Sequence, residues 1–283
     1  MNRVAVVGAG TMGNGIAHVF AQYGWGVRLI DVSAEALESG LAAIRRNLAR
    51  QVKKGTLTEA AAAGSVARIE TARSLDAAVG GGIELVVEAA SERPDLKFQI
   101  FRDLAAACGE DTILASNTSS ISITAIAGHT TCPDRVIGMH FMNPVPVMKL
   151  VEVIRGHHTS DATMDRVMTI ITALDKTPVE VNDYPGFVAN RVLLPMINEA
   201  VYCVMEGVAT PEAVDTVMKL GLAHPMGPLA LADLIGLDVC LSILTVLHQE
   251  LGDDKYRPCP LLRRMVAAGD LGRKTGRGFY SYG

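Results

Sequence analysis

The sequence has few cysteines, few aromatic residues and no excess of positive charge, and these shortages exclude several classes of protein. Its five cysteines are odd in number and form no CxxC pair, so neither a metal site nor a disulfide framework is expected, and the reducing cytoplasm is the expected compartment. A formal net charge of −4 excludes a general attraction to nucleic acid or to an anionic membrane. We therefore expect small-molecule partners, and any phosphate binding must be local.

Long uninterrupted apolar runs are also missing. The most apolar later stretch, GPLALADLIGLDVCLSILTVL, contains Asp233 and Asp238, and we expect it to form a buried helix rather than a membrane span. The apolar start, MNRVAVVGAG, is too short for a signal peptide and runs directly into a glycine loop. No targeting segment is expected.

Short aliphatic runs, in contrast, are abundant, and they alternate with longer helical patterns. Strands that are apolar on both faces and separated by helices predict a mostly parallel sheet with helices on both sides. The expected strands are 4–7, 27–31, 84–87, 112–115, 136–140, 150–154 and 179–181. Apolar residues at helical spacing predict a helical insertion at about 33–68.

A glycine-rich loop, GAGTMG, directly follows the first expected strand and precedes a helical run. Gly8 can make the tight turn, Gly10 can let a pyrophosphate approach the backbone, and Gly13 can seat the helix against the sheet. The backbone at Thr11 and Met12 belongs to the same expected cofactor site. A simple turn remains the alternative for the glycines taken alone.

The end of the next strand decides between these alternatives. Asp31 stands where a carboxylate accepts hydrogen bonds from the adenosine ribose, and its charge would repel a 2′-phosphate. Glycine loop and acid together predict an NAD-binding, Rossmann-type doubly wound domain at 1–183. After NDYPG the patterns are helical, apart from a terminal GFYSY that reads as a strand, so an all-α domain is expected at 184–283.

Ligands of such sheets lie outside the carboxyl ends of the strands. This rule directs attention to Glu92 and Lys97, to the SNTSS loop at 116–120 and to His140. Histidine titrates near neutral pH and can remove a hydroxyl proton during alcohol oxidation, and Glu152 is its candidate partner after a loop with two prolines. Taken singly, a satisfied core histidine and a solvent-facing glutamate remain the alternatives.

Uncharged donors accompany these candidates. Asn117, Ser119, Ser120 and Asn190 could hold a substrate oxygen without competing for the proton. Loop capping and hydration of a helix surface are the alternative explanations, above all for Asn117 and Ser120.

Six motifs in order resemble the L-3-hydroxyacyl-CoA dehydrogenases, most closely the short bacterial 3-hydroxybutyryl-CoA dehydrogenases. They are GAGTMGNGIA, VVEAASE, ASNTSSISIT, GMHFMNPVPVMKLVE, PGFVANR and GRKTGRGFY, and they run from the first strand to the last few residues. The resemblance implies reversible, NAD-dependent oxidation of an (S)-3-hydroxyacyl-CoA, with a short acyl chain as in 3-hydroxybutyryl-CoA. It also implies a homodimer formed through the C-terminal helices.

The resemblance further implies residue roles. His140 would be the catalytic base with Glu152 as its partner, while Ser119 and Asn190 would bind the reacting oxygen. Residues near the cofactor would be Glu92, Lys97, Ser119, Asn143 and Lys274. The helical insertion would receive the coenzyme A phosphates on a basic face formed by Arg46, Arg50, Lys53 and Lys54, for which a solvated helix face is the alternative.

Two other functions compete with this expectation. β-Hydroxyacid dehydrogenases share the glycine loop and a helical second domain but act on free acids with a lysine catalyst. The alternative that is not an enzyme is a non-catalytic dinucleotide-binding protein, similar to the related lens crystallins.

Overall fold

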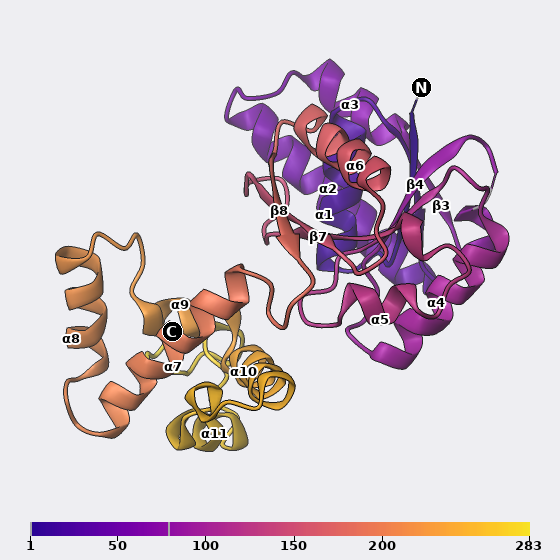
Figure 1. Cartoon of the computed structure of the whole chain (residues 1–283). Coiled ribbons are helices and arrows are strands. Elements are labelled where there is room, and N and C mark those ends of the chain that lie inside the picture. Colours follow the sequence, from indigo (N-terminus) through magenta and orange to yellow (C-terminus); the bar gives the residue numbers. More distant parts are fainter. Residues whose placement is uncertain (1, 79) are drawn as a thin grey trace. The chain divides into compact units, whose positions relative to one another are not determined.

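The computed structural model describes residues 2–78 and 80–283. The chain divides into two compact units, Met1–Asp183 and Tyr184–Gly283 (Figure 1). Each unit has its own hydrophobic core.

Within the described residues, the first unit contains an eight-stranded sheet in the order β3-β2-β1-β4-β5-β6-β7-β8. Neighbouring strands are parallel except β6 and β7, which are antiparallel. The strand order changes direction between β1 and β4, which is the switch point where such sheets bind ligands. The strands are β1 (Arg3–Val7), β2 (Gly26–Ile30), β3 (Ile69–Ala72), β4 (Ile83–Glu88), β5 (Ile113–Ser116), β6 (Val136–Phe141), β7 (Leu150–Arg155) and β8 (Thr177–Asn182).

Helices cover both faces of this sheet, which explains why β5 and β6 are buried along their whole length and β1 is buried after its first residue. Side chains of α1, α2 and α6 share one core with the strands, while α4 and α5 contact each other on the opposite side (Figure 1). The helices are α1 (Thr11–Gln22), α2 (Ala34–Lys53), α3 (Glu59–Ala67), α4 (Pro94–Ala107), α5 (Ile123–Ala127) and α6 (Asp161–Ala173), with 3₁₀ turns η1 (Leu75–Ala78) and η2 (Pro133–Arg135).

The second unit is helical around its own apolar core. Two buried aspartates organise it: Asp215 accepts hydrogen bonds from the first amides of α9, and Asp233 accepts from the amides of Phe279 and Tyr280. The elements are α7 (Ala189–Met205), α8 (Pro211–Thr216), the π-helical η3 (Val217–Gly221), α9 (Pro228–Ile235), α10 (Leu237–Leu251), η4 (Asp254–Tyr256), α11 (Pro260–Ala267) and η5 (Arg273–Thr275).

The predicted fold class, a doubly wound and mostly parallel sheet with a helical insertion and an all-α second unit, is confirmed. Three local predictions differ from the structure. The edge strand β3 was not expected, because Ile69–Ala72 is short and half of its residues are polar and exposed. The terminal GFYSY takes part in one isolated bridge, between Arg277 and Ser281, instead of forming a strand, because Asp233 accepts hydrogen bonds from the amides of Phe279 and Tyr280.

The third difference concerns the long apolar stretch, which forms two helices instead of one. Gly236, with φ of 106°, separates α9 from α10, and the two helices are bent by 98°. Among the described residues no single helix is long and apolar enough to cross a membrane; α9 and α10 meet that test of length and composition only when taken together.

One buried histidine joins the first helix to the insertion. His18 on α1 is fully buried, and its Nε2 lies 3.0 Å from Gln22 Oε1 and 3.1 Å from the side-chain amide of Gln51 on α2. Its Nδ1 has no hydrogen-bond partner among the described residues. Burial lowers the pKa of His18, the hydrogen bond with Gln22 opposes this shift, and the charge of Lys176 adds to it.

This shift predicts a pH-dependent stability. Because the unfolded imidazole binds a proton more readily than the folded one, the free energy of unfolding should fall as the pH drops below the ordinary histidine value of 6.5. One such group contributes a slope of at most about 1.4 kcal/mol per pH unit. In thermal unfolding measured between about pH 8 and pH 5, the stability of His18→Gln should fall less steeply toward low pH than that of the wild type. Equal slopes would contradict this role for His18.

Candidate functional site

The glycine loop lies at the switch point between β1 and β4. Gly8 has a φ of 102°, and a Cβ there would lie 2.6 Å from the carbonyl oxygen of Ala89 after β4. A Cβ on Gly13 would overlap the carbonyl oxygen of Gly8, so α1 can pack this closely against the loop only because residue 13 is glycine. A Cβ on Gly10 would meet no chain atom within 4 Å, so the loop leaves open space at this one backbone position.

These features fit the pyrophosphate of a dinucleotide. Among the described residues no side chain caps α1 at Gly10, so the amides of its first turn, including Thr11 and Met12, point outward from the loop. Uncapped amides and the positive end of the helix dipole favour a phosphate at this place. The chain therefore offers the cradle that NAD requires.

Asp31 lies directly after β2 and holds the glycine loop from the other side. Its Oδ2 accepts a hydrogen bond of 2.8 Å from the amide of Ala9, and its Oδ1 accepts one of 2.9 Å from the amide of Ser33. Ser33 in turn caps α2 through its hydroxyl. The half-buried carboxylate retains lone pairs for ribose hydroxyls, as predicted for an NAD-specific strand end.

A network of charges follows β4. The Lys97 ammonium, 1% exposed, lies 2.6 Å from Glu88 and 3.3 Å from Glu92. Glu92 Oε1 accepts hydrogen bonds from the hydroxyl of Thr118 at 2.5 Å and from the amide of Ser119 at 2.9 Å. The loop after β5 is thus bound to the segment after β4.

The Glu92 carboxyl is held in its ionised form by this network. Burial acts to raise its pKa, but the charge of Lys97 and the hydrogen bonds from Thr118, Ser119 and Ser120 outweigh burial and lower the pKa of Glu92. An ionised carboxylate only accepts hydrogen bonds, so it orients every donor around it.

His140 and Glu152 occupy directly opposed positions in the antiparallel pair of β6 and β7. Their side chains therefore lie on the same face of the sheet, and Nδ1 of His140 lies 2.7 Å from Oε2 of Glu152. Both side chains are buried, with Glu152 only 2% exposed. The loop between the strands does fold back, and it brings the predicted pair into hydrogen-bond contact.

The connection between these strands is held at several points. Lys176 donates hydrogen bonds of 2.7 Å to the carbonyl oxygens of Val145 and Met148, and the buried Val145 lies against Gly15 of α1. Burial, with a smaller contribution from Lys149, lowers the pKa of Lys176 to about 8. Asn143, predicted to lie near the nicotinamide, is exposed at the start of this connection and precedes a cis peptide bond.

The serine loop makes several hydrogen bonds within the chain. Asn117 Oδ1 accepts a hydrogen bond of 3.0 Å from the amide of Phe141, next to His140. Ser120 donates its hydroxyl and amide to Glu92, and Ser119 donates its amide and hydroxyl to the same oxygen. Loop capping therefore accounts for these contacts of Asn117 and Ser120, and the half-buried Ser119 shares the same acceptor.

Two predicted residues belong to the second unit. Asn190 lies in the first turn of α7 and is half-buried. Lys274 lies in η5 and donates a hydrogen bond of 2.6 Å to Asp238 at the start of α10. Burial acts to raise the pKa of Asp238, but its contacts with Lys274 lower it overall.

The basic residues of the insertion share one exposed surface. Arg46 and Arg50 lie on α2, Lys53 ends it and Lys54 follows, and all four side chains are exposed. Arg50 makes a hydrogen bond of 3.5 Å with Asn47. Apolar residues on the other side of α2 are buried, which explains why the charges face outward.

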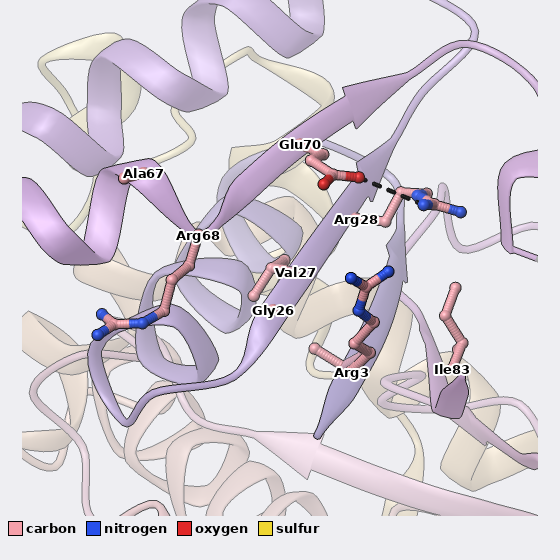
Figure 2. A pocket seen from close by; sticks show the side chains of 9 residues that line it. Arg3, Gly26, Val27, Arg28, Ala67, Arg68, Glu70 and Ile83 are labelled. Atoms are coloured by element: carbon pink, nitrogen blue, oxygen red, sulfur yellow. Dashed lines mark hydrogen bonds and ion pairs between the residues drawn. The ribbon is translucent and has the colours of Figure 1, made fainter. Parts of the chain in front are cut away.

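The opposite edge of the sheet offers a contrast. A hollow of 190 Å³ lies at the amino ends of β1, β2 and β4, where Arg28 pairs with Glu70 at 3.3 Å and Arg3 lies close by (Figure 2). No predicted site residue lines this hollow. The predicted cofactor and catalytic residues of the first unit lie instead at the carboxyl edge, whereas the predicted coenzyme A residues lie on and after α2.

Sequence reasoning missed Glu88 at this edge and noted Ser116 only as the first residue of the SNTSS loop. Both end a buried strand, and both are fully buried. An acid at the last position of an otherwise apolar strand, as in IELVVE, is the pattern that could have revealed Glu88, because buried carboxylates require partners.

Family models identify the two units. The model for the NAD binding domain of 3-hydroxyacyl-CoA dehydrogenase matches residues 3–184, and the model for the C-terminal domain of 3-hydroxyacyl-CoA dehydrogenase matches residues 186–282. The chain belongs to the 3-hydroxyacyl-CoA dehydrogenase family. This result confirms the resemblance found in the six motifs and NAD as the cofactor.

Individual relatives match over the whole chain. The chain is 58% identical over 282 residues to the probable 3-hydroxybutyryl-CoA dehydrogenase of Bacillus subtilis. This match covers 100% of this chain and 98% of that protein. It is 43% identical over 288 residues to human mitochondrial hydroxyacyl-coenzyme A dehydrogenase, covering 100% and 91%. The crystal structure of (S)-3-hydroxybutyryl-CoA dehydrogenase PaaH1 from Ralstonia eutropha superposes with a TM-score of 0.96 at 52% identity, over 100% of this chain and 99% of that one.

A matched pair of glycine variants tests the cofactor cradle. Gly13→Ala forces the start of α1 away from Gly8, so the melting temperature of the ligand-free protein should fall and NADH binding should be lost. Gly10→Ala meets no chain atom, so the melting temperature should stay unchanged while the methyl group weakens NADH binding at least about tenfold, or about 1.4 kcal/mol. Fluorescence titration and thermal melting measure both effects. Wild-type NADH affinity in Gly10→Ala would place the pyrophosphate elsewhere.

Proposed function

We propose that the chain catalyses the reversible, NAD-dependent oxidation of an (S)-3-hydroxyacyl-CoA to the 3-oxoacyl-CoA, with a short-chain substrate such as 3-hydroxybutyryl-CoA. Family membership over both units and the names of the full-length relatives support the reaction. The contact of 2.7 Å between His140 Nδ1 and Glu152 Oε2 is the observation that carries the proposed mechanism.

The pair of side chains assigns the path of the proton. An ionised Glu152 can only accept a hydrogen bond, so Nδ1 of His140 carries the proton and Nε2 takes the accepting role. In oxidation Nε2 removes the proton of the substrate hydroxyl while the hydride leaves C3; in reduction the imidazolium returns that proton to the oxygen of the ketone. Glu152, buried beside the ring, stabilises the imidazolium in both directions.

Other residues bind and orient the reactants. Ser119 and Asn190 bind the reacting oxygen. NAD, when bound, would supply the hydride acceptor, and the residues that would hold its pyrophosphate and adenosine are Gly8, Gly10, Thr11, Met12, Gly13 and Asp31. The first-unit residues that would contact the nicotinamide are Glu92, Lys97, Ser119 and Asn143, and Lys274 of the second unit is proposed as a further cofactor residue.

Two further parts of the proposal concern coenzyme A and assembly. The exposed Arg50, Lys53 and Lys54, with Arg46, bind its phosphates. A homodimer forms through the second unit, where η3 and the residue after it present strongly exposed apolar side chains, Leu220 at 83% and Leu222 at 62%. The molar mass in solution, from light scattering, tests the dimer.

Substrate comparison separates this reaction from its rivals. The wild type should oxidise NADH with acetoacetyl-CoA and should turn over little free acetoacetate. It should prefer NADH to NADPH, because Asp31 would repel the 2′-phosphate of NADPH. His140→Ala should lose on the order of a hundred- to ten-thousandfold in kcat and still bind NADH, since general acid–base catalysis contributes about this much.

The rivals give different results in the same assays. Faster turnover of the free acid would indicate a β-hydroxyacid dehydrogenase. Absence of NADH oxidation with every CoA thioester would indicate a non-catalytic dinucleotide-binding protein. Wild-type kcat in His140→Ala would refute the mechanism while leaving the reaction itself in place.

A further inference from the structure

The fully buried carboxylate of Glu88 stands at the last position of β4 and has a role in none of the functions described above. Its Oε1 accepts hydrogen bonds from the amide of Ala90 at 2.7 Å and from the Lys97 ammonium at 2.6 Å. Its Oε2 accepts one from the hydroxyl of Ser116 at 2.7 Å. Two of these donors, Lys97 and Ser116, lead to the loop that carries Ser119.

The first route runs through Ser116. Its hydroxyl donates to Glu88 and accepts a hydrogen bond of 3.2 Å from the amide of Thr118, at the start of the loop. The backbone takes part as well, because the amide of Asn117 donates to the carbonyl oxygen of Glu88 at 2.8 Å. Glu88 therefore fixes the first residues of the loop directly.

The second route runs through Lys97 and Glu92. The Lys97 ammonium has three acceptors for its three N–H groups: Glu88 at 2.6 Å, Glu92 at 3.3 Å and the carbonyl oxygen of Ala90 at 3.3 Å. Glu92, 38% exposed, binds the amide of Ser119 at 2.9 Å. The ammonium is thus shared between two carboxylates, and the buried one makes the shorter contact.

This sharing determines where Glu92 lies. If Glu88 were uncharged, the buried ammonium would have Glu92 as its remaining counter-charge, and attraction would draw the two together. Glu92 would then move relative to the amides of Ser119 and Ser120 that it holds. Displacements of about 1 Å at such positions can cost about a hundredfold in rate.

We propose that Glu88 is a positioning residue of the reaction: it sets the place of Ser119 through Ser116 on one side and through Lys97 and Glu92 on the other. The inference rests on the proposed function, because Ser119 matters only if it binds the reacting oxygen. The Glu88 side chain is fully buried and both of its oxygens are hydrogen-bonded within the chain, so its removal should affect the rate more than the binding of NADH.

The test compares Glu88→Gln with the wild type using acetoacetyl-CoA and NADH. We expect kcat per folded molecule to fall at least tenfold, and by a larger factor than the affinity for NADH, which Glu92 and Lys97 would also contact. An unchanged kcat, or a loss confined to NADH affinity, would overturn the proposal. If the wild type turns over no 3-oxoacyl-CoA, the proposed function fails instead, and the two failures are distinct.

A control variant separates positioning from general destabilisation. Asp215 is a buried carboxylate of the second unit and is 3% exposed. Like Glu88, it accepts three hydrogen bonds, one of them from a hydroxyl. Its donors are the amides of Leu229 and Ala230 and the hydroxyl of Tyr280. Asp215→Asn should lower the melting temperature and keep kcat per folded molecule within twofold. An equal loss of kcat in both variants would overturn the proposal.

A double variant covers the case in which Glu88→Gln folds poorly. Removing one charge of a buried pair is strongly destabilising, whereas removing both restores much of the stability. Glu88→Gln combined with Lys97→Met should therefore regain melting temperature while kcat stays at least tenfold low, because Glu92 has lost the ammonium that places it. Recovery of kcat together with stability would show that the pair serves the fold alone.

Discussion

The antiparallel pairing of β6 with β7 is the constraint on which the proposed chemistry depends. Because His140 and Glu152 are directly opposed, they share one face and meet at 2.7 Å. A slip of one residue in this register would turn Glu152 to the other face of the sheet and separate the pair. The connection that sets the register is itself fixed by Lys176 and by the contact of Val145 with α1. Helix α1 and the β6–β7 hairpin are therefore packed together within the first unit.

The parallel part of the sheet contributes a second constraint. Strands β1, β2, β4, β5 and β6 all end at the same edge, so the topology itself makes neighbours of the glycine loop, Asp31, Glu88, the serine loop and His140, and hydrogen bonds such as that from Ala9 to Asp31 then fix their positions. The charges placed at this edge are costly to bury and are tolerated because each is paired or hydrogen-bonded: Lys97 by two carboxylates, Glu152 by the imidazole. Such pairs add little net stability, and their value lies in holding donors and acceptors at defined places.

Much of this arrangement could be predicted from the residues. Continuous β-branched runs identified seven of the strands, and the spacing of Gly8, Gly10, Gly13 and Asp31 indicated the dinucleotide edge. The contact between His140 and Glu152 was one of two alternatives, since only the register of β6 and β7 decides it. The resemblance of six motifs to a known family went further, because it assigned roles that no spacing can show.

The remaining features depend on tertiary contacts. β3 is a short edge strand without an apolar pattern, and the terminal GFYSY stays outside the regular strands because the distant Asp233 binds its amides. The hydrogen bond from the amide of Phe141 to Oδ1 of Asn117 joins residues 24 positions apart, and no local pattern shows it. Glu88 escaped notice because its three donors come from residues 2, 9 and 28 positions away, and no local pattern shows that they converge.

The central claim, that Glu152 orients the imidazole of His140 for proton transfer, is tested most directly by the ¹⁵N NMR spectrum of histidine-labelled protein. The ring-nitrogen signals that disappear from the spectrum of His140→Gln are those of His140. The account predicts that the neutral ring carries its proton on Nδ1, facing Glu152, and leaves Nε2 unprotonated. It also predicts that this preference weakens in Glu152→Gln. A neutral ring protonated on Nε2 in the wild type would contradict the account.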